Sequence, residues 1–111
     1  MSAMAVLLVR ELLVDDIVDS PDVARVTGAT PRSVSRWQEG VSPRRPAEER
    51  LLELKAVVDL LRQVLREEPA HLWIRSPEPG LAYEKPLDLI RRGEYRRVIG
   101  AILALAEGIT A

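Results

Sequence analysis

Residues 47–66 read AEERLLELKAVVDLLRQVLR, and the apolar pattern of this stretch decides the fold class. Apolar residues recur every three or four positions along it, which is the spacing of one face of an α-helix. The stripe consists of Leu51, Leu54, Val58, Leu61 and Leu65, and it is widened by Leu52, Val57, Leu60 and Val64. A stripe this wide predicts a long helix that packs against more than one neighbouring element.

Shorter helices are predicted on both sides of the long helix. Ser20-Pro21 and Thr30-Pro31 each place a proline in a first helical turn behind a capping hydroxyl. The predicted ranges are 3–18, 21–27, 31–39, 69–75, 86–92 and 94–107. No stretch alternates over the length of a strand, so we expect an all-α fold. Its predicted parts are a helix-turn-helix bundle (1–46), a long connecting helix (47–68) and a small helical C-terminal unit (69–111).

Composition limits the chemistry that the chain can perform. It has 111 residues, 47% of them apolar and 30% charged, which fits one globular domain. Cysteine is absent and His71 is the single histidine, which excludes thiolate zinc sites, histidine clusters and cysteine nucleophiles. The six glycines stand singly, without the spacing of a phosphate-binding loop. We therefore expect no catalytic residue, metal or cofactor, and we place His71 on a helix surface or at a helix cap.

Apolar runs in the chain are short. The longest lie at residues 4–9 and 98–106, and neither is long enough to span a bilayer. No basic region precedes the first run, which argues against a signal peptide. We expect a cytoplasmic protein without a membrane partner.

A helix-turn-helix pattern lies between residues 23 and 37. Ala24 is small where two helices would cross, and Gly28 permits the positive φ of a tight turn. Val34 and Trp37 lie one helical turn apart, where both reach the core. The start of the second helix, at Thr30, would direct backbone N–H groups at a phosphate. The pattern predicts DNA binding, and the alternative is a pair of helices used only for packing.

Local charge supports the DNA-binding interpretation. The whole chain has a net charge of −1, from 16 basic and 17 acidic residues, and 14 of the basic residues are arginine. Residues 25–45, in contrast, hold five arginines and one acid, for a local charge of +4, whereas residues 1–22 hold five acids and one arginine. The residues predicted to contact DNA are Thr30, Arg32, Ser33, Ser35, Arg36, Gln38, Arg44 and Arg45.

The C-terminal part carries two further motifs. Residues 72–77 read LWIRSP, and residues 85–98 read KPLDLIRRGEYRRV. Together they resemble the toxin-binding domain of the Xre/MbcA/ParS-type antitoxins. The upstream residues 30–37, TPRSVSRW, are similar to the helix-turn-helix of the same family. The resemblance extends from about Asp22 to the end of the chain, although residues 78–84 depart from the loop found in many members.

This resemblance implies a partner and a mechanism. The partner would be a RES-domain toxin that destroys NAD, and the C-terminal unit would block its active site sterically. The resemblance also implies a homodimer that binds operator DNA and represses its own operon. An alternative from the residues themselves is a stand-alone regulator whose C-terminal region only dimerises.

The predicted toxin-binding residues comprise mostly apolar residues between positions 73 and 99, arginines of the same segment, and the last three residues of the chain. They are Trp73, Pro77, Pro86, Leu87, Ile90, Arg91, Tyr95, Arg96, Ile99, Ile109, Thr110 and Ala111. The arginines form two doublets, 91–92 and 96–97, which suit charge-assisted contacts with an acidic groove or form a solvated face. The small and apolar tail frays as a free end or inserts into a partner's cleft.

Overall fold

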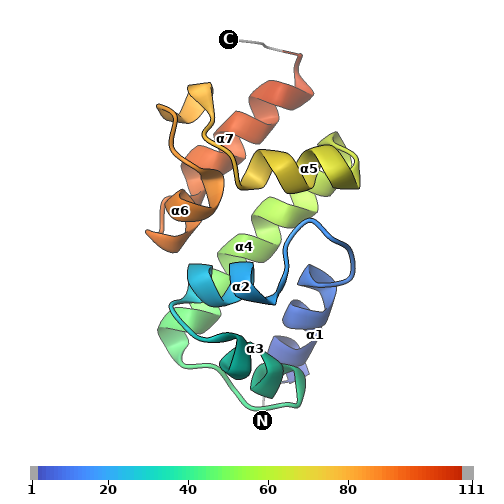
Figure 1. Cartoon of the computed structure of the whole chain (residues 1–111), viewed down its shortest axis with the longest axis vertical. Coiled ribbons are helices and arrows are strands. Elements are labelled where there is room, and N and C mark those ends of the chain that lie inside the picture. The colour runs from blue at the N-terminus through green and yellow to red at the C-terminus, as the bar shows by residue number, and fades with distance from the viewer. Residues whose placement is uncertain (1–2, 109–111) are drawn as a thin grey trace.

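A computed structural model describes residues 3–108, and within them the chain is helical (Figure 1). The helices are α1 (Ala3–Leu12), α2 (Ser20–Thr27), α3 (Pro31–Gln38), α4 (Arg45–Val64), α5 (Glu67–Ile74), α6 (Pro86–Arg91) and α7 (Tyr95–Ala106), with a 3₁₀ turn, η1 (Pro79–Leu81). Over this described part there is no strand, and a single β-bridge joins Glu78 to Glu84. The expected all-α class is confirmed.

The long helix α4 is the centre of the structure. Figure 1 shows α1, α2 and α3 towards one end of it and α5, α6 and α7 towards the other. Its buried side chains are Ala47, Leu51, Leu54, Val57, Val58 and Leu61. As its wide stripe predicts, α4 contacts several helices, namely α1, α2, α5, α6 and α7. It begins at Arg45, earlier than predicted, because Pro46 fits its first turn, and it ends where Leu65 becomes extended.

The prediction of one helix over residues 3–18 is wrong, because α1 ends at Leu12. The chain then follows an irregular path through residues 13–19, here called the α1–α2 loop. This path buries Ile17 and Val18, each 1% exposed, and lets Asp19 cap α2 by accepting a hydrogen bond from the Asp22 N–H. A continued helix would forgo the cap and displace both apolar side chains from the core.

Helices α2 and α3 are joined by residues 28–30. Gly28 has a φ of 74°, and its N–H donates to carbonyls at the end of α2. Thr30 caps α3, since its Oγ1 accepts from the Ser33 N–H at 3.1 Å. Val34 is fully buried and Trp37 is 6% exposed, so both serve the core as predicted.

One hydrophobic core contains buried residues from all three predicted parts of the chain. Helix α2 contacts α6, and Arg25 on α2 forms an ion pair with Asp88 on α6 at 2.7 Å. The three predicted parts, 1–46, 47–68 and 69–111, therefore share one core. Their separate functional roles remain a prediction. Among the helices of residues 3–108, none has the length and apolar character needed to cross a membrane.

Candidate functional site

Four arginines around α3 are left without a carboxylate partner. We call Arg32, Arg36, Arg44 and Arg45 the α3 basic surface. All four are exposed, and no ion pair within residues 3–108 involves them. The fold makes no use of these charges internally, so they are available to an anionic partner.

A hollow of about 520 Å³ adjoins this surface. The N-caps of two helices line it, Thr30 for α3 and Arg44 for α4, together with Arg36. Three residues with hydroxyl groups also line the hollow, namely Thr27, Ser33 and Ser42. The starts of two helices and two guanidinium groups give this hollow the chemistry of an anion site.

The predicted DNA contacts differ in how free they are. Ser35 is exposed, whereas Ser33 and Gln38 are half-buried. The Thr30 hydroxyl is already engaged as the cap of α3 and lies 3.2 Å from the Ser33 hydroxyl. Thr30 and Ser33 therefore shape the start of α3, and the four arginines provide the available charge.

The predicted toxin-binding residues separate into a buried frame and an exposed surface. Pro86, Leu87 and Ile90 are buried, so they support the surface from beneath. Trp73, Tyr95 and Ile99 are half-buried and pack against the core. Pro77, Arg91 and Arg96 are exposed. Ile109, Thr110 and Ala111 lie outside the described residues.

The two arginine doublets are split by their ion pairs. Arg92 binds Glu84 at 2.7 Å and Glu94 at 2.9 Å, and Arg97 binds the same two carboxylates. Hydrogen bonds from Arg92 hold the pKa of Glu84 and that of Glu94 below the usual value. Arg91 and Arg96 form no ion pair within residues 3–108. Only these two members of the doublets present a free charge.

Trp73 has an indole N–H that is buried without a hydrogen-bond partner in the described part of the chain. Its ring packs against the core from α5. A buried, unpaired donor costs stability, so the contribution of this residue comes from packing.

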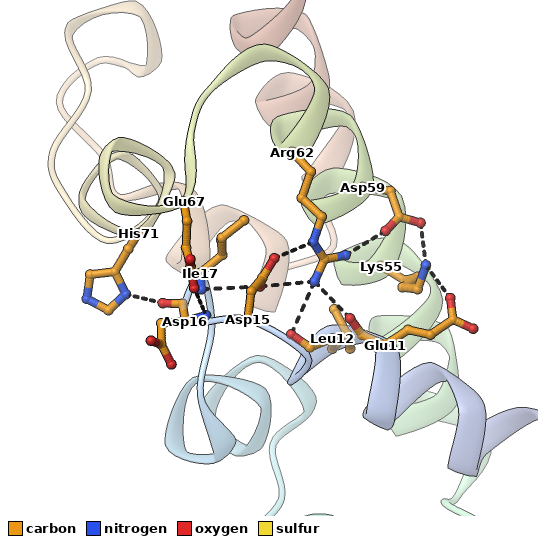
Figure 2. Close-up of polar contacts among 10 residues, drawn as sticks. All are labelled: Glu11, Leu12, Asp15, Asp16, Ile17, Lys55, Asp59, Arg62, Glu67 and His71. Carbon is orange, nitrogen blue, oxygen red and sulfur yellow. Dashed lines mark hydrogen bonds and ion pairs between the residues drawn. The ribbon is translucent and has the colours of Figure 1, made fainter.

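The α1–α2 loop is held by side chains from α4 and α5, as Figure 2 shows. Arg62 donates to Asp15 Oδ2 and to the Glu11 carbonyl, each at 2.8 Å, and also binds Asp59. The hydrogen bond from Arg62 holds the pKa of Asp15 below its usual value. Lys55 binds Asp59 and, at 3.0 Å, Glu11. Arg62 thus donates a hydrogen bond to a backbone carbonyl at the end of α1, and its ion pair with Asp15 holds the loop that follows.

Helix α5 binds the second half of this loop. His71 Nδ1 lies 2.5 Å from the Asp16 carbonyl oxygen and 3.1 Å from Arg75 Nη2 (Figure 2 shows the first contact). Glu67 accepts a hydrogen bond from the Asp16 N–H at 2.6 Å. Arg75 donates to the Ile17 carbonyl at 2.8 Å and to both oxygens of Asp22. His71 therefore lies on α5, half-buried, with its ring against the backbone of the α1–α2 loop.

Asp22 is the buried charged residue of the described chain, 9% exposed. Its burial raises the pKa, but hydrogen bonds from Arg75 and from the Asp19 backbone outweigh this, and the pKa lies below the usual value. No motif in the sequence points to Asp15, Asp22, Arg62 or Arg75. The excess of acids in residues 1–22 was the available signal, because such a cluster requires cations that only the fold can supply.

Individual relatives of known function identify the family of this chain, although no family model matches it. The mycobacterial cidal antitoxin MbcA, from Mycobacterium bovis and from Mycobacterium tuberculosis, is 46% identical over 89 residues, which are 79% of each chain. A probable mycobacterial cidal antitoxin of M. tuberculosis is 30% identical over 114 residues, covering 95% of this chain and 97% of the relative.

A solved structure agrees with these sequences. The crystal structure of the M. tuberculosis MbcT-MbcA toxin-antitoxin complex contains a chain that matches this one with a TM-score of 0.87 and 38% identity, covering all of both chains. The relatives are antitoxins, which confirms the expectation that the chain is not an enzyme. The chain belongs to the family of mycobacterial cidal antitoxins that includes MbcA.

Proposed function

We propose that this antitoxin neutralises an MbcT-type toxin by covering it with the surface of α6 and α7. The match over the full chain to a chain of the MbcT-MbcA complex carries this proposal. Arg91 and Arg96 are exposed cations on this surface that form no ion pair within residues 3–108, and buried Leu87 and Ile90 support it from beneath. The mechanism is steric, since binding and exclusion of substrate require no chemistry from this chain.

The toxin, by the resemblance of the motifs at residues 72–77 and 85–98, is of the RES-domain type and degrades NAD. Insertion of Ile109, Thr110 and Ala111 into its active site remains part of the proposal. The likeness to MbcA favours this function over a stand-alone regulator, because the match extends over the C-terminal unit.

The test uses purified MbcT, with isothermal titration calorimetry for affinity and an NAD-consumption assay for neutralisation. We expect the double variant Arg91→Ala and Arg96→Ala to bind at least tenfold more weakly and to protect NAD less. Arg10→Ala is the matched control, because Arg10 is an exposed arginine on α1 without an ion pair in the described chain. Equal loss in the control, or no loss in the double variant, would contradict the assignment of the surface.

We further propose that α2 and α3 form a helix-turn-helix that binds operator DNA and represses the operon of the antitoxin. The four free arginines of the α3 basic surface and the adjoining hollow support this role. A homodimer in the cytoplasm completes the proposal, with two copies of α3 on two half-sites. Sedimentation velocity of the purified chain tests the dimer.

Salt dependence tests the DNA contacts. If all four arginines contact phosphates, the plot of log affinity against log salt has a slope of about −3.6 per chain, at roughly −0.9 per contact. The variant Arg44→Ala with Arg45→Ala should reduce the magnitude of this slope by about 1.8. Fluorescence anisotropy with the DNA upstream of the operon gives both values. A slope near zero would leave α2 and α3 as a packing unit.

A further inference from the structure

Gly100 lies in the middle of α7, on the exposed side of the helix. Its φ is not positive, unlike the φ of Gly28 or Gly93, so its backbone conformation is open to any residue. Apart from its chain neighbours and the backbone of its own helix, no atom of the described chain lies within 4 Å of the position that a Cβ would occupy. Neither conformation nor internal packing explains a glycine here.

This glycine has a cost in the free chain. A helix-interior glycine makes the folding equilibrium about fivefold less favourable than alanine does, because glycine loses more backbone entropy on folding. Ala101, Ala104 and Ala106 occupy other positions of the same helix. An alanine at position 100 would thus be compatible with the fold and would stabilise it.

The neighbours of Gly100 on the helix surface are suited to a partner. Arg96 lies four residues before it, exposed and without an ion pair in the described chain. Leu103 lies three residues after it and is 47% exposed. Residues at these spacings share one side of a helix. Val98 and Ile102, on the opposite side, are fully buried. The outer face of α7 therefore presents a cation, a gap and an apolar side chain in succession.

We propose that Gly100 is required for tight toxin binding, because its missing side chain lets a segment of toxin backbone approach α7. This inference rests on the proposed function. The fitting segment has a carboxylate beside Arg96 and an apolar side chain against Leu103. The toxin is the occupant that fits, because the matched solved chain belongs to a toxin-antitoxin complex and exposed Arg91 and Arg96 suit an acidic partner. A second copy of this chain would bring the same free arginines to the contact.

The experiment compares stability with affinity in one variant. Gly100→Ala should raise the melting temperature of the free antitoxin by about 4 °C, from the helix propensity of alanine and the size of the domain. The same methyl group should weaken binding to MbcT by at least tenfold, and Gly100→Leu should abolish binding while the chain remains folded by circular dichroism. A glycine with a purely structural role would not give this combination of higher stability and lower affinity when it is replaced.

Gly80→Ala is the matched control. Gly80 also has a φ that is not positive and open space around its missing Cβ, so the change adds the same methyl group elsewhere. Its affinity for MbcT should equal that of the wild type. Wild-type affinity in Gly100→Ala, or an equal loss in Gly80→Ala, overturns the inference. Disrupted self-association with intact toxin binding also overturns it, in favour of a second copy.

The two proposals fail in different ways. If the folded wild-type chain does not bind MbcT, the proposed function falls, and the inference falls with it. If the wild type binds and Gly100→Ala binds equally well, only the inference falls.

Discussion

Replacing Arg75 with methionine tests whether α5 holds the start of α2. The guanidinium of Arg75 binds both oxygens of Asp22, at 2.8 and 3.1 Å, and the Ile17 carbonyl at 2.8 Å. Methionine retains much of the apolar stem and removes these bonds. The Asp22 carboxylate then keeps the Asp19 N–H as its hydrogen-bond donor, at 3.1 Å.

The expected loss follows from burial. Breaking a fully buried ion pair by removing one partner costs about 3–5 kcal/mol. Here the side chain of Arg75 is 26% exposed and that of Asp22 is 12% exposed, so water reaches the pair. We therefore expect a loss of about 2–3 kcal/mol, after a discount for solvent screening. For a domain of this size, this corresponds to a fall in Tm of roughly 8–12 °C.

Urea and thermal unfolding followed by circular dichroism measure this loss at pH 7. Arg91→Met is the matched control, because Arg91 is exposed and lacks an ion pair in the described chain; its change should stay within about 0.5 kcal/mol. A double-mutant cycle with Asp22→Asn isolates the pair. A loss below about 0.5 kcal/mol for Arg75→Met, or one equal to the control, would refute the reasoning.

The pKa of Asp22 gives the same pair a pH dependence. Its folded-state pKa lies below the unfolded value, since hydrogen bonds from Arg75 and Asp19 outweigh the effect of burial. The stabilisation is therefore present above about pH 4 and is lost as the pH falls through the folded-state pKa. The difference between wild type and Arg75→Met should narrow below about pH 4. A constant difference down to about pH 2 would exclude a role for Asp22.

Three further substitutions have expected outcomes, each measured by urea unfolding. Gly93→Ala should cost about 1–2 kcal/mol, because Gly93 has a φ of 85° and its Cβ would lie 2.9 Å from Arg50 Nη2; wild-type stability would contradict the left-handed turn. Arg25→Ala should cost less than about 1 kcal/mol, since its ion pair with Asp88 is exposed, and a larger loss would mean that this pair organises α2 against α6. Trp73→Phe should change stability by less than about 1 kcal/mol, because it removes an unpaired donor along with apolar area. A loss above about 2 kcal/mol would contradict this expectation.

Local patterns in the sequence were sufficient to predict most of the helices. The stripe on α4 and the turn at Gly28 depend on residues a few positions apart, and both appear in the structure. The end of α1 was different. Leu13, Ile17 and Val18 continue a helical spacing, but Arg62 and Arg75, about fifty residues away, bind the loop instead. A contact at that separation leaves no periodic trace in the sequence.

The candidate surfaces were predicted less completely for the same reason. Arg91, Arg92, Arg96 and Arg97 look alike in the sequence, and only the fold brings Glu84 to two of them. Burial divides the predicted toxin-binding residues in a similar way, since Leu87 is in the core and Pro77 is exposed. Spacing predicted the segments, but only the fold shows which of their side chains are exposed and which are paired.

The distribution of ion pairs explains how a chain with a net charge of −1 can present a strongly basic surface. The acids Asp15, Asp22 and Glu84 form ion pairs with one arginine on α4 and with the arginines that directly follow α5 and α6. The α3 basic surface keeps its charge because no carboxylate pairs with it in the described chain. At physiological salt, charges interact over about 8 Å, whereas the molecule is 44 Å long. A phosphate placed at α3 would therefore respond to the local arginines and not to the net charge.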